Sequence, residues 1–243
     1  MKILALESSA TACSVALCRD GELVAQNYQN SGLTHSRTLM PMVDSLLTNC
    51  GERLEDVDVI AVAAGPGSFT GLRIGVATAK GLAWAGNKDC APCSTLESMA
   101  WPLAHMKDAI VVCAMDARRS QVYNALFRAT GEGLERLSPD RAISLAELGE
   151  ELKKYENRKI VVGDGAKLCY NTLTNEGILL ELAPAYLRMQ SAWGVARAAE
   201  ELAARGGLVK GDELAPVYHR LSQAEREHLE REKIQKEGEP QNV

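Results

Sequence analysis

Aromatic residues are scarce in this sequence of 243 residues: two Phe, three Trp and six Tyr make up 5% of it. Proteins that bind single-stranded nucleic acid stack the bases on aromatic side chains, so this function class is disfavoured. Basic residues are not in excess either, because 27 Lys and Arg stand against 32 Asp and Glu and give a net charge of -5. A chain that grips a phosphate backbone carries a basic face. We therefore expect any nucleic acid to be held by another protein.

Long apolar runs are also missing. The N-terminal run MKILAL is interrupted by Glu7 before it reaches the length of a signal segment or a membrane span, which predicts a cytoplasmic protein with no membrane association. Seven cysteines is an odd number, and several lie in apolar runs, as buried thiols of a reducing compartment do. The 46% hydrophobic and 24% charged residues are typical of a globular protein.

Patterns of metal ligands are absent as well. None of the four histidines, His35, His105, His219 and His228, has a second histidine at ligand spacing on the same element. The pair in Cys90-Ala91-Pro92-Cys93 has no second pair, and the helix that would make it a redox motif begins only after Ser94. We predict no metal site, no cofactor and no catalytic residue.

What is present is an alternation of strands and helices. Apolar runs broken by the turn at 19–21 predict a three-stranded antiparallel meander over residues 2–29. Spacings of three and four then predict a helix over 35–50, in which Pro41 should lie in the opening turn. A buried strand over 57–64 leads through Gly65-Pro66-Gly67 into a helix over 70–85, and Ser94 with Glu97 marks the start of a helix over 95–105.

The second half resembles a shortened copy of the first. It reads as strands over 109–115 and 121–128, a helix over 145–155, a strand over 159–162 that enters Gly163-Asp164-Gly165, and a helix over 192–204. These elements predict an α/β protein of two lobes with mixed sheets, the second lobe reduced. We divide it into a first lobe with partner-binding helices (1–106), a second lobe (107–221) and a polar helical tail (222–243).

The helix over 70–85 is small or apolar on nearly every face, so it should be buried on more than one side. Glycines inside a helix cost about 1 kcal/mol each, and close packing must compensate Gly75 and Gly81. A subunit interface is one explanation, and completion of the monomer core is the other. The predicted interface comprises Leu39, Met42, Val43, Leu46, Leu47, Gly71, Ile74, Gly75, Thr78, Ala79 and Leu82.

Two turns have the residue types of a nucleotide or anion site. Glu7 ends the first strand before the hydroxyl residues Ser8 and Ser9, where actin-like ATPases place an aspartate, but a polar hairpin turn with an exposed carboxylate is the alternative. Gly65, Gly67 and Ser68 precede a helix whose first amides are free to bind an anion. The loop matches neither a Walker motif nor a dinucleotide fingerprint, so a structural turn is equally compatible.

The segments ILALESS, GPGSFTGLRIGVATAKGLA, STLE, MDARRSQVY, VGDGA and PVYHRLSQAE, in this order, resemble the TsaB family, formerly YeaZ. The resemblance extends over residues 3–227. It implies two actin-like (RNase H-like) lobes and a bacterial subunit that is needed to form N6-threonylcarbamoyladenosine at position 37 of tRNA. It also implies direct pairing with the catalytic subunit TsaD, assembly with the ATPase TsaE, a homodimer when TsaD is absent, and contact with tRNA only through the complex.

One departure from the TsaD pattern matters for the function. TsaD-like chains carry a His-x-x-x-His metal pair on the helix after the meander, whereas this chain has His35 with Arg37 and Leu39 where a second ligand would be sought. The resemblance therefore implies a noncatalytic scaffold that activates TsaD through the helices over 35–50 and 70–85. The alternative is an independent actin-like ATPase or small-molecule kinase, in which Glu7, Ser9 and Gly163-Asp164-Gly165 would converge on a nucleotide.

Overall fold

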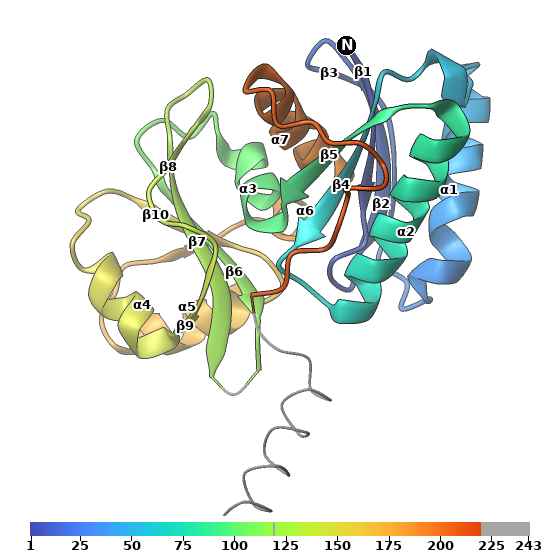
Figure 1. Ribbon diagram of the computed structural model, residues 1–243. Coiled ribbons are helices and arrows are strands. Elements are labelled where there is room, and N and C mark those ends of the chain that lie inside the picture. Colours follow the sequence, from blue (N-terminus) through green and yellow to red (C-terminus); the bar gives the residue numbers. More distant parts are fainter. Residues whose placement is uncertain (119, 220–243) are drawn as a thin grey trace, which may run out of the picture.

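The computed structural model describes residues 1–118 and 120–219, and the predicted tail over 222–243 lies outside this part of the chain. The protein has two α/β lobes side by side, each built on one twisted sheet (Figure 1). Among the described residues, none of the helices combines the length and the apolar character needed to cross a bilayer.

The first lobe contains a five-stranded sheet in the order β3-β2-β1-β4-β5. The meander pairs antiparallel, and β4 and β5 continue the sheet in parallel with β1. The central strands are buried on both faces, as their unbroken apolar runs predict. The strands are β1 (Lys2–Glu7), β2 (Cys13–Arg19), β3 (Glu22–Gln29), β4 (Val59–Gly65) and β5 (Asp89–Ser94).

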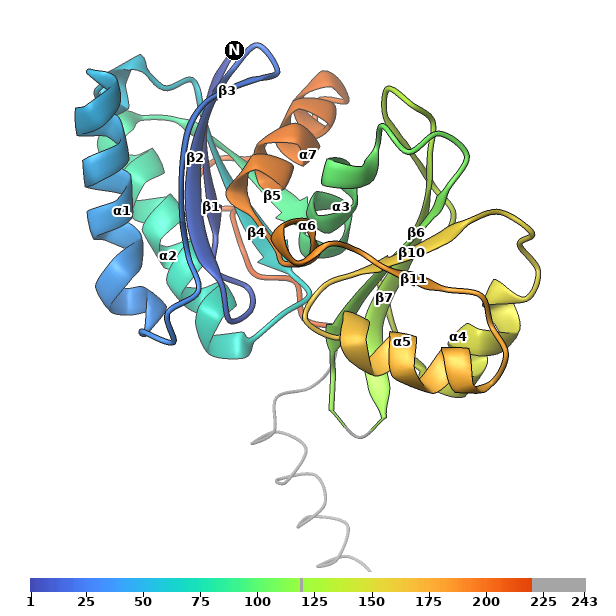
Figure 2. The ribbon, with the colours of Figure 1, turned by 180° about the vertical axis from the view of Figure 1, so that it is seen from behind.

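Three helices cover this sheet. Helices α1 (His35–Cys50) and α2 (Phe69–Gly86) lie next to each other on one face, and α7 (Ala192–Ala204) packs on the other (Figures 1 and 2). Helix α1 covers β2 and β3, and α2 covers β4. Pro41 lies inside α1 rather than in its opening turn. A short 3₁₀ helix (Leu54–Asp56) precedes β4.

The second lobe repeats the topology of the first. Its sheet has the order β11-β10-β6-β7-β8, with β9 also paired to β7; β6 and β7 are antiparallel, and β6, β10 and β11 are parallel. This confirms the fold that the sequence predicts, two lobes with mixed sheets. The strands are β6 (Ile110–Asp116), β7 (Gln121–Ala129), β8 (Leu134–Arg136), β9 (Arg141–Ser144), β10 (Lys159–Val162) and β11 (Glu181–Leu182).

The remaining helices are short. Helix α3 (Thr95–Ala100) ends sooner than the predicted 95–105 and continues as a 3₁₀ turn (Trp101–Leu103) that contains a proline. In the second lobe, α4 (Leu145–Leu152) and α5 (Ala166–Asn175) lie together on one face of the sheet, and α6 (Ala185–Arg188) follows β11 (Figure 2).

After the second lobe, the chain returns to the first. Helix α7 packs on β1, β2 and β5, although it follows the second sheet in sequence. Residues 208–218 then cross the same lobe: Val209 and Cys90 exchange two backbone hydrogen bonds, Leu214 enters the core, and the Val217 N–H donates to the Ala64 carbonyl at 2.7 Å. The division at residue 107 thus separates the two sheets but not the elements that pack on them.

Candidate partner surface and lobe boundary

The row of small residues on α2 faces the protein's own sheet. Gly71 and Gly75 lie against Ser8, whose hydroxyl donates to the Gly71 carbonyl at 2.9 Å. A Cβ on Gly71 would lie 2.1 Å from the Ser8 carbonyl oxygen, and one on Gly75 would lie 2.5 Å from the Ser8 hydroxyl. Ala79, one turn further along, is completely buried. These small residues therefore let α2 approach the first sheet and its hairpin.

Most of the predicted interface residues are core residues. On α2 only Ile74 and Thr78, and on α1 only Met42, are partly exposed. The others are buried inside the first lobe, because they form the sheet-facing sides of the two helices. They are Leu39, Val43, Leu46, Leu47, Gly71, Gly75, Ala79 and Leu82. Of the predicted interface residues, only Met42, Ile74 and Thr78 therefore reach the surface.

The outward face of α2 is made of different residues. Ala77, Gly81 and Ala85 are exposed, and a Cβ on Gly81 would meet no other atom within 4 Å. Trp84 is 89% exposed, far more than a tryptophan usually is. Trp84 is not among the interface residues predicted from the sequence. We call Ile74, Ala77, Thr78, Gly81, Trp84 and Ala85 the α2 outer face.

Glu7 is buried at the boundary between the lobes and is not the exposed carboxylate of a polar turn. Its Oε1 accepts a hydrogen bond of 2.6 Å from the Ser9 N–H, and its Oε2 has no hydrogen-bond partner among the described residues. Burial raises the pKa of Glu7 to about 7, and the negative charge of Asp164 acts in the same direction. Near neutral pH this carboxyl group therefore keeps its proton in a large part of the molecules.

The glycine loop before α2 is filled by the chain itself. The Ser68 N–H donates to the Ser9 carbonyl at 2.7 Å, and a Cβ on Gly67 would lie 2.6 Å from that same oxygen. On Gly65 it would lie 2.2 Å from the Val217 carbonyl oxygen. The Ser68 hydroxyl accepts the Gly71 N–H as the helix cap. The close approach that these glycines allow is used by the protein's own backbone.

Asp164 follows β10 of the second lobe and lies at the same boundary. Its carboxylate accepts a hydrogen bond of 3.1 Å from the Gln190 side chain, and burial raises its pKa. Gly163 and Gly165 hold this turn against the end of β6, because a Cβ on Gly163 would lie 2.0 Å from the Ala114 carbonyl oxygen. Asp164 is near enough to Glu7 for its negative charge to act on the Glu7 carboxyl group. Within residues 1–118 and 120–219, no three His, Cys, Asp or Glu side chains are grouped as metal ligands.

The two cysteines of the Cys-x-x-Cys pair lie on opposite faces of β5. Cys90 belongs to the core under α1 and α2, and Cys93 to the core under α7. Burial raises the pKa of Cys90 to about 11 and raises that of Cys93 further. Strand geometry therefore separates the two thiols, and neither is an activated thiolate.

A partly exposed polar network links one lobe to the other. Arg136, at the end of β8, donates to Glu97 of α3 at 2.7 Å and to Asp140 at 2.6 Å. Asp140 also accepts the Ser94 hydroxyl from the end of β5, and the Arg136 guanidinium lies over the Phe127 ring. These contacts join residues of both sheets.

Comparison with known proteins shows where the chain belongs. A family model described as TsaD, tRNA N6-adenosine threonylcarbamoyltransferase, matches residues 29–226. The tRNA threonylcarbamoyladenosine biosynthesis protein TsaB of Bacillus subtilis is 32% identical over 96% of this chain and its own full length. The chain belongs to the TsaB family. The Escherichia coli TsaB is 32% identical over 90% of the chain and 95% of its own length.

The structural comparison agrees with this membership. YeaZ from Pseudomonas aeruginosa is 28% identical, with a TM-score of 0.73 over 89% of this TsaB-family chain and 99% of its own. A second Pseudomonas aeruginosa structure, described as similar to peptidase YEAZ, has a TM-score of 0.78 at 27% identity, over 90% of this chain and 99% of its own. The tRNA N6-adenosine threonylcarbamoyltransferase of Geotalea uraniireducens is 33% identical, but only over 35% of this chain and 29% of its own.

The helix that carries the metal pair in TsaD-like chains has other contacts in this TsaB-family chain. His35 is hydrogen-bonded through Nε2 to the Ala10 carbonyl at 2.7 Å. Arg37 is exposed, and Leu39 is buried in the core of the first lobe. The three side chains therefore point to different surroundings.

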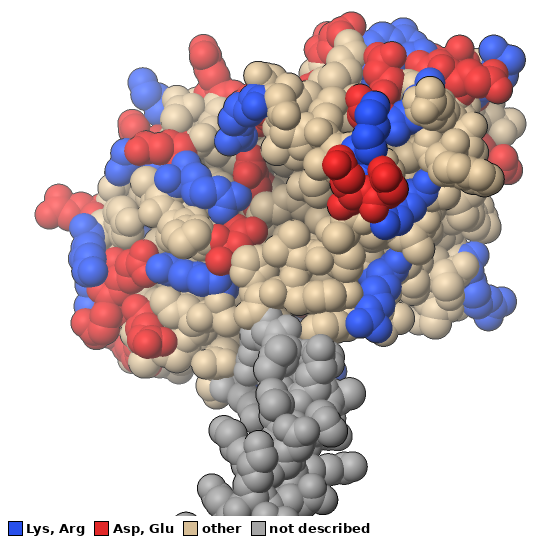
Figure 3. All heavy atoms as spheres, viewed as in Figure 1, with Lys and Arg blue, Asp and Glu red and all other residues tan. Residues whose placement is uncertain are grey.

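Acidic and basic side chains alternate on the face drawn in Figure 3, which has no continuous basic surface.

Proposed function

We propose that this TsaB-family chain is an accessory subunit in the synthesis of N6-threonylcarbamoyladenosine on tRNA. The proposal rests on the similarity to the tRNA threonylcarbamoyladenosine biosynthesis protein TsaB of Bacillus subtilis. The match extends over the full length of that protein at 32% identity. Partial similarity to threonylcarbamoyltransferases, together with the TsaD family model, supports an evolutionary relation to the catalytic subunit.

The lobe boundary supports a noncatalytic role. In an actin-like enzyme, the first hairpin and the loop before α2 would have to admit nucleotide phosphates. In this chain, Glu7 accepts the Ser9 N–H, and the backbones of Ser9 and Val217 fill the space beside Gly67 and Gly65. The network around Arg136 holds the two lobes together. The chain would therefore act through its surface and not through a reaction of its own.

The surface that we propose for the catalytic partner is the α2 outer face. Small residues such as Ala77 and Gly81 allow a second helix to approach closely, and exposed Trp84 is the residue type that most often anchors an interface. Met40, 46% exposed on neighbouring α1, is a further apolar contact. The partner is a TsaD-family subunit, and a second copy of this chain occupies the same face when that subunit is absent. TsaE joins the assembly, and tRNA is bound only through the complex.

Reconstitution tests this function. The chain is combined with a TsaD-family subunit, TsaE, the enzyme that makes threonylcarbamoyl-AMP, ATP and unmodified tRNA, and the modified nucleoside is measured by mass spectrometry. Modification should require this chain together with the TsaD-family subunit, and neither alone should suffice. Equal modification without this chain would refute the proposal.

Two buried carboxyl groups at the lobe boundary, Glu7 and Asp164, favour a second candidate, an actin-like ATPase or small-molecule kinase, because such enzymes bind nucleotide between their lobes. Calorimetric titration of the chain alone with magnesium-ATP separates the two functions. The accessory role predicts no saturable heat and no phosphate release. A tight nucleotide site that disappears in Glu7→Gln would support the second candidate.

A further inference from the structure

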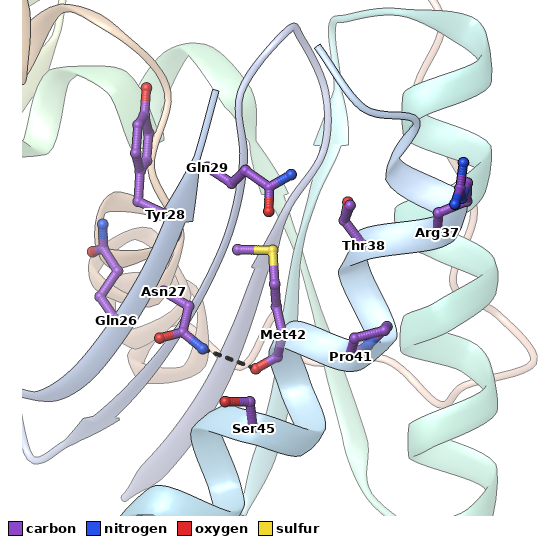
Figure 4. Close-up of a pocket in the computed structure, with 9 residues that line it drawn as sticks. All are labelled: Gln26, Asn27, Tyr28, Gln29, Arg37, Thr38, Pro41, Met42 and Ser45. Carbon is purple, nitrogen blue, oxygen red and sulfur yellow. Dashed lines mark hydrogen bonds between the residues drawn. The ribbon is translucent and has the colours of Figure 1, made fainter. Parts of the chain in front are cut away.

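A polar groove lies between β3, an edge strand of the first sheet, and α1, on the side of α1 away from α2 (Figure 4). It has a volume of about 540 Å³. The groove is lined by Asn27 and Gln29 of β3 and by Arg37, Pro41, Met42 and Ser45 of α1. Asn27 closes its floor by donating to the Met42 carbonyl at 3.2 Å. We call it the β3–α1 groove.

Strand β3 is open to pairing along this groove. It ends the sheet, so one side of its backbone has no neighbouring strand among the described residues. Proteins protect such edges with lysine, proline or a covering segment. Strand β3 contains no Lys or Pro, and its Leu23, Val24 and Tyr28 are each 45–47% exposed. The strand therefore offers both unpaired backbone groups and apolar side chains.

The helical side of the groove is suited to an acidic residue. Arg37 is exposed and has no ion-pair partner among the described residues. The first turn of α1 has no acidic side chain, so the positive end of the helix dipole is not neutralised there.

We propose that the β3–α1 groove binds an extended segment of a partner protein, which adds to the sheet as a sixth strand beside β3. From Arg37 to Ser45, α1 rises about 12 Å, which matches about four residues of an extended chain. Backbone pairing with β3 supplies the affinity, and alternate side chains enter the groove. One of these is an aspartate or glutamate that pairs with Arg37. This site is separate from the α2 outer face, and the inference does not depend on the proposed function.

The probe is a capped, fluorescent peptide of ten residues, alternating threonine and valine with one central glutamate. Fluorescence anisotropy should show saturable binding, about tenfold tighter than for the same peptide with lysine in place of the glutamate. Arg37→Glu should reverse this preference, whereas Arg53→Glu, at the residue before the 3₁₀ helix that precedes β4, should not. Ser45→Trp fills the groove and should abolish binding, while Thr48→Trp, exposed on the same helix, should have no effect. Unchanged thermal unfolding of the four variants shows that they are folded.

Backbone pairing has its own test. In an added strand only every second N–H faces β3, so N-methylation of one alternate set should abolish binding, and N-methylation of the other set should preserve it. Hydrogen exchange should slow in residues 22–29 when the glutamate peptide binds. Equal binding of the two methylated peptides, or no binding at 1 mM, would overturn the proposal. It would also be overturned if the outward-facing amides of β3, which do not pair with β2, were already protected in the chain alone, because a second copy would then occupy the edge.

Discussion

Ser8 and Gly71 form a hydrogen bond of 2.9 Å between the first hairpin and the first turn of α2, 63 residues apart in the sequence. The contact is close enough to exclude any side chain at position 71, because a Cβ would lie 2.1 Å from the Ser8 carbonyl oxygen. The position of α2 on the sheet, and therefore of its outer face, depends on this glycine.

Two glycines of α2 should respond oppositely to alanine. Gly71→Ala should lower the free energy of unfolding by about 3 kcal/mol, since backbone must move to admit the methyl group. Gly81→Ala meets open space and should raise it by about 0.5–1 kcal/mol, because alanine favours the helix. Urea unfolding of both variants measures the two effects. Equal changes would mean that Gly71 does not lie against the Ser8 carbonyl group.

The partner surface can be tested with a residue that the fold does not need. Trp84→Ala should weaken binding to a TsaD-family subunit by about 2 kcal/mol, or roughly thirtyfold, and leave thermal unfolding unchanged. Tyr186→Ala is the control, because Tyr186 is 83% exposed on the second lobe. Ala79→Leu should behave in the opposite way, with a lower melting temperature and unchanged binding by its folded fraction, because Ala79 is buried. Full affinity of Trp84→Ala would place the interface elsewhere.

The sequence predicted the elements well where hydrophobic and polar residues alternate with a clear period. Helix α1 has the predicted bounds because its apolar stripe is bordered by polar residues. Helix α5 was missed, because only Ala166, Cys169 and Leu173 of its ten residues are buried. Strand β5 was not predicted, because its short run contains Pro92 and two cysteines and lacks the β-branched residues typical of strands.

The inward and outward faces of α2 could not be distinguished in the same way. Alanine and glycine occupy both sides of this helix, and neither residue type indicates burial by itself. The decisive contact is with Ser8, which is distant in sequence. Glu7 illustrates the same limit, because its burial depends on the packing of two lobes whose contact no local pattern encodes.

The network between the lobes should contribute to stability through Arg136. Arg136→Met leaves Glu97 and Asp140 without this donor and removes the guanidinium from the Phe127 ring, and we expect a loss of about 2 kcal/mol in the free energy of unfolding. Hydrogen exchange over 94–100 should accelerate. Arg128→Met removes a pair within the second lobe, between side chains that are 38% and 53% exposed, and should cost less than about 1 kcal/mol. Similar losses in both variants would argue against a special role of the network.

Glu7 should make the protein less stable as the pH rises. Its pKa is raised from 4.5 to about 7 in the folded state, chiefly by burial, so the folded protein holds this proton more tightly than the unfolded chain does. Between about pH 4.5 and 7 the carboxyl group ionises in the unfolded chain but remains largely protonated in the folded protein. Ionisation therefore stabilises the unfolded state relative to the folded state. The free energy of unfolding therefore falls with increasing pH, by at most roughly 3 kcal/mol from this group, and levels off once the pH has passed the folded-state pKa of about 7.

Glu7→Gln should remove this fall, because an amide accepts the Ser9 N–H and does not ionise. Urea unfolding at pH 5, 6, 7 and 8 should show that the variant gains stability relative to the natural chain at each step up to pH 7. Glu132→Gln, an exposed control, should follow the natural chain throughout. Asp164, whose pKa is also raised by burial, contributes in the same direction, and Asp164→Asn measures its share. Parallel pH profiles of the natural chain and Glu7→Gln would show that the pKa of Glu7 is not raised in the folded protein.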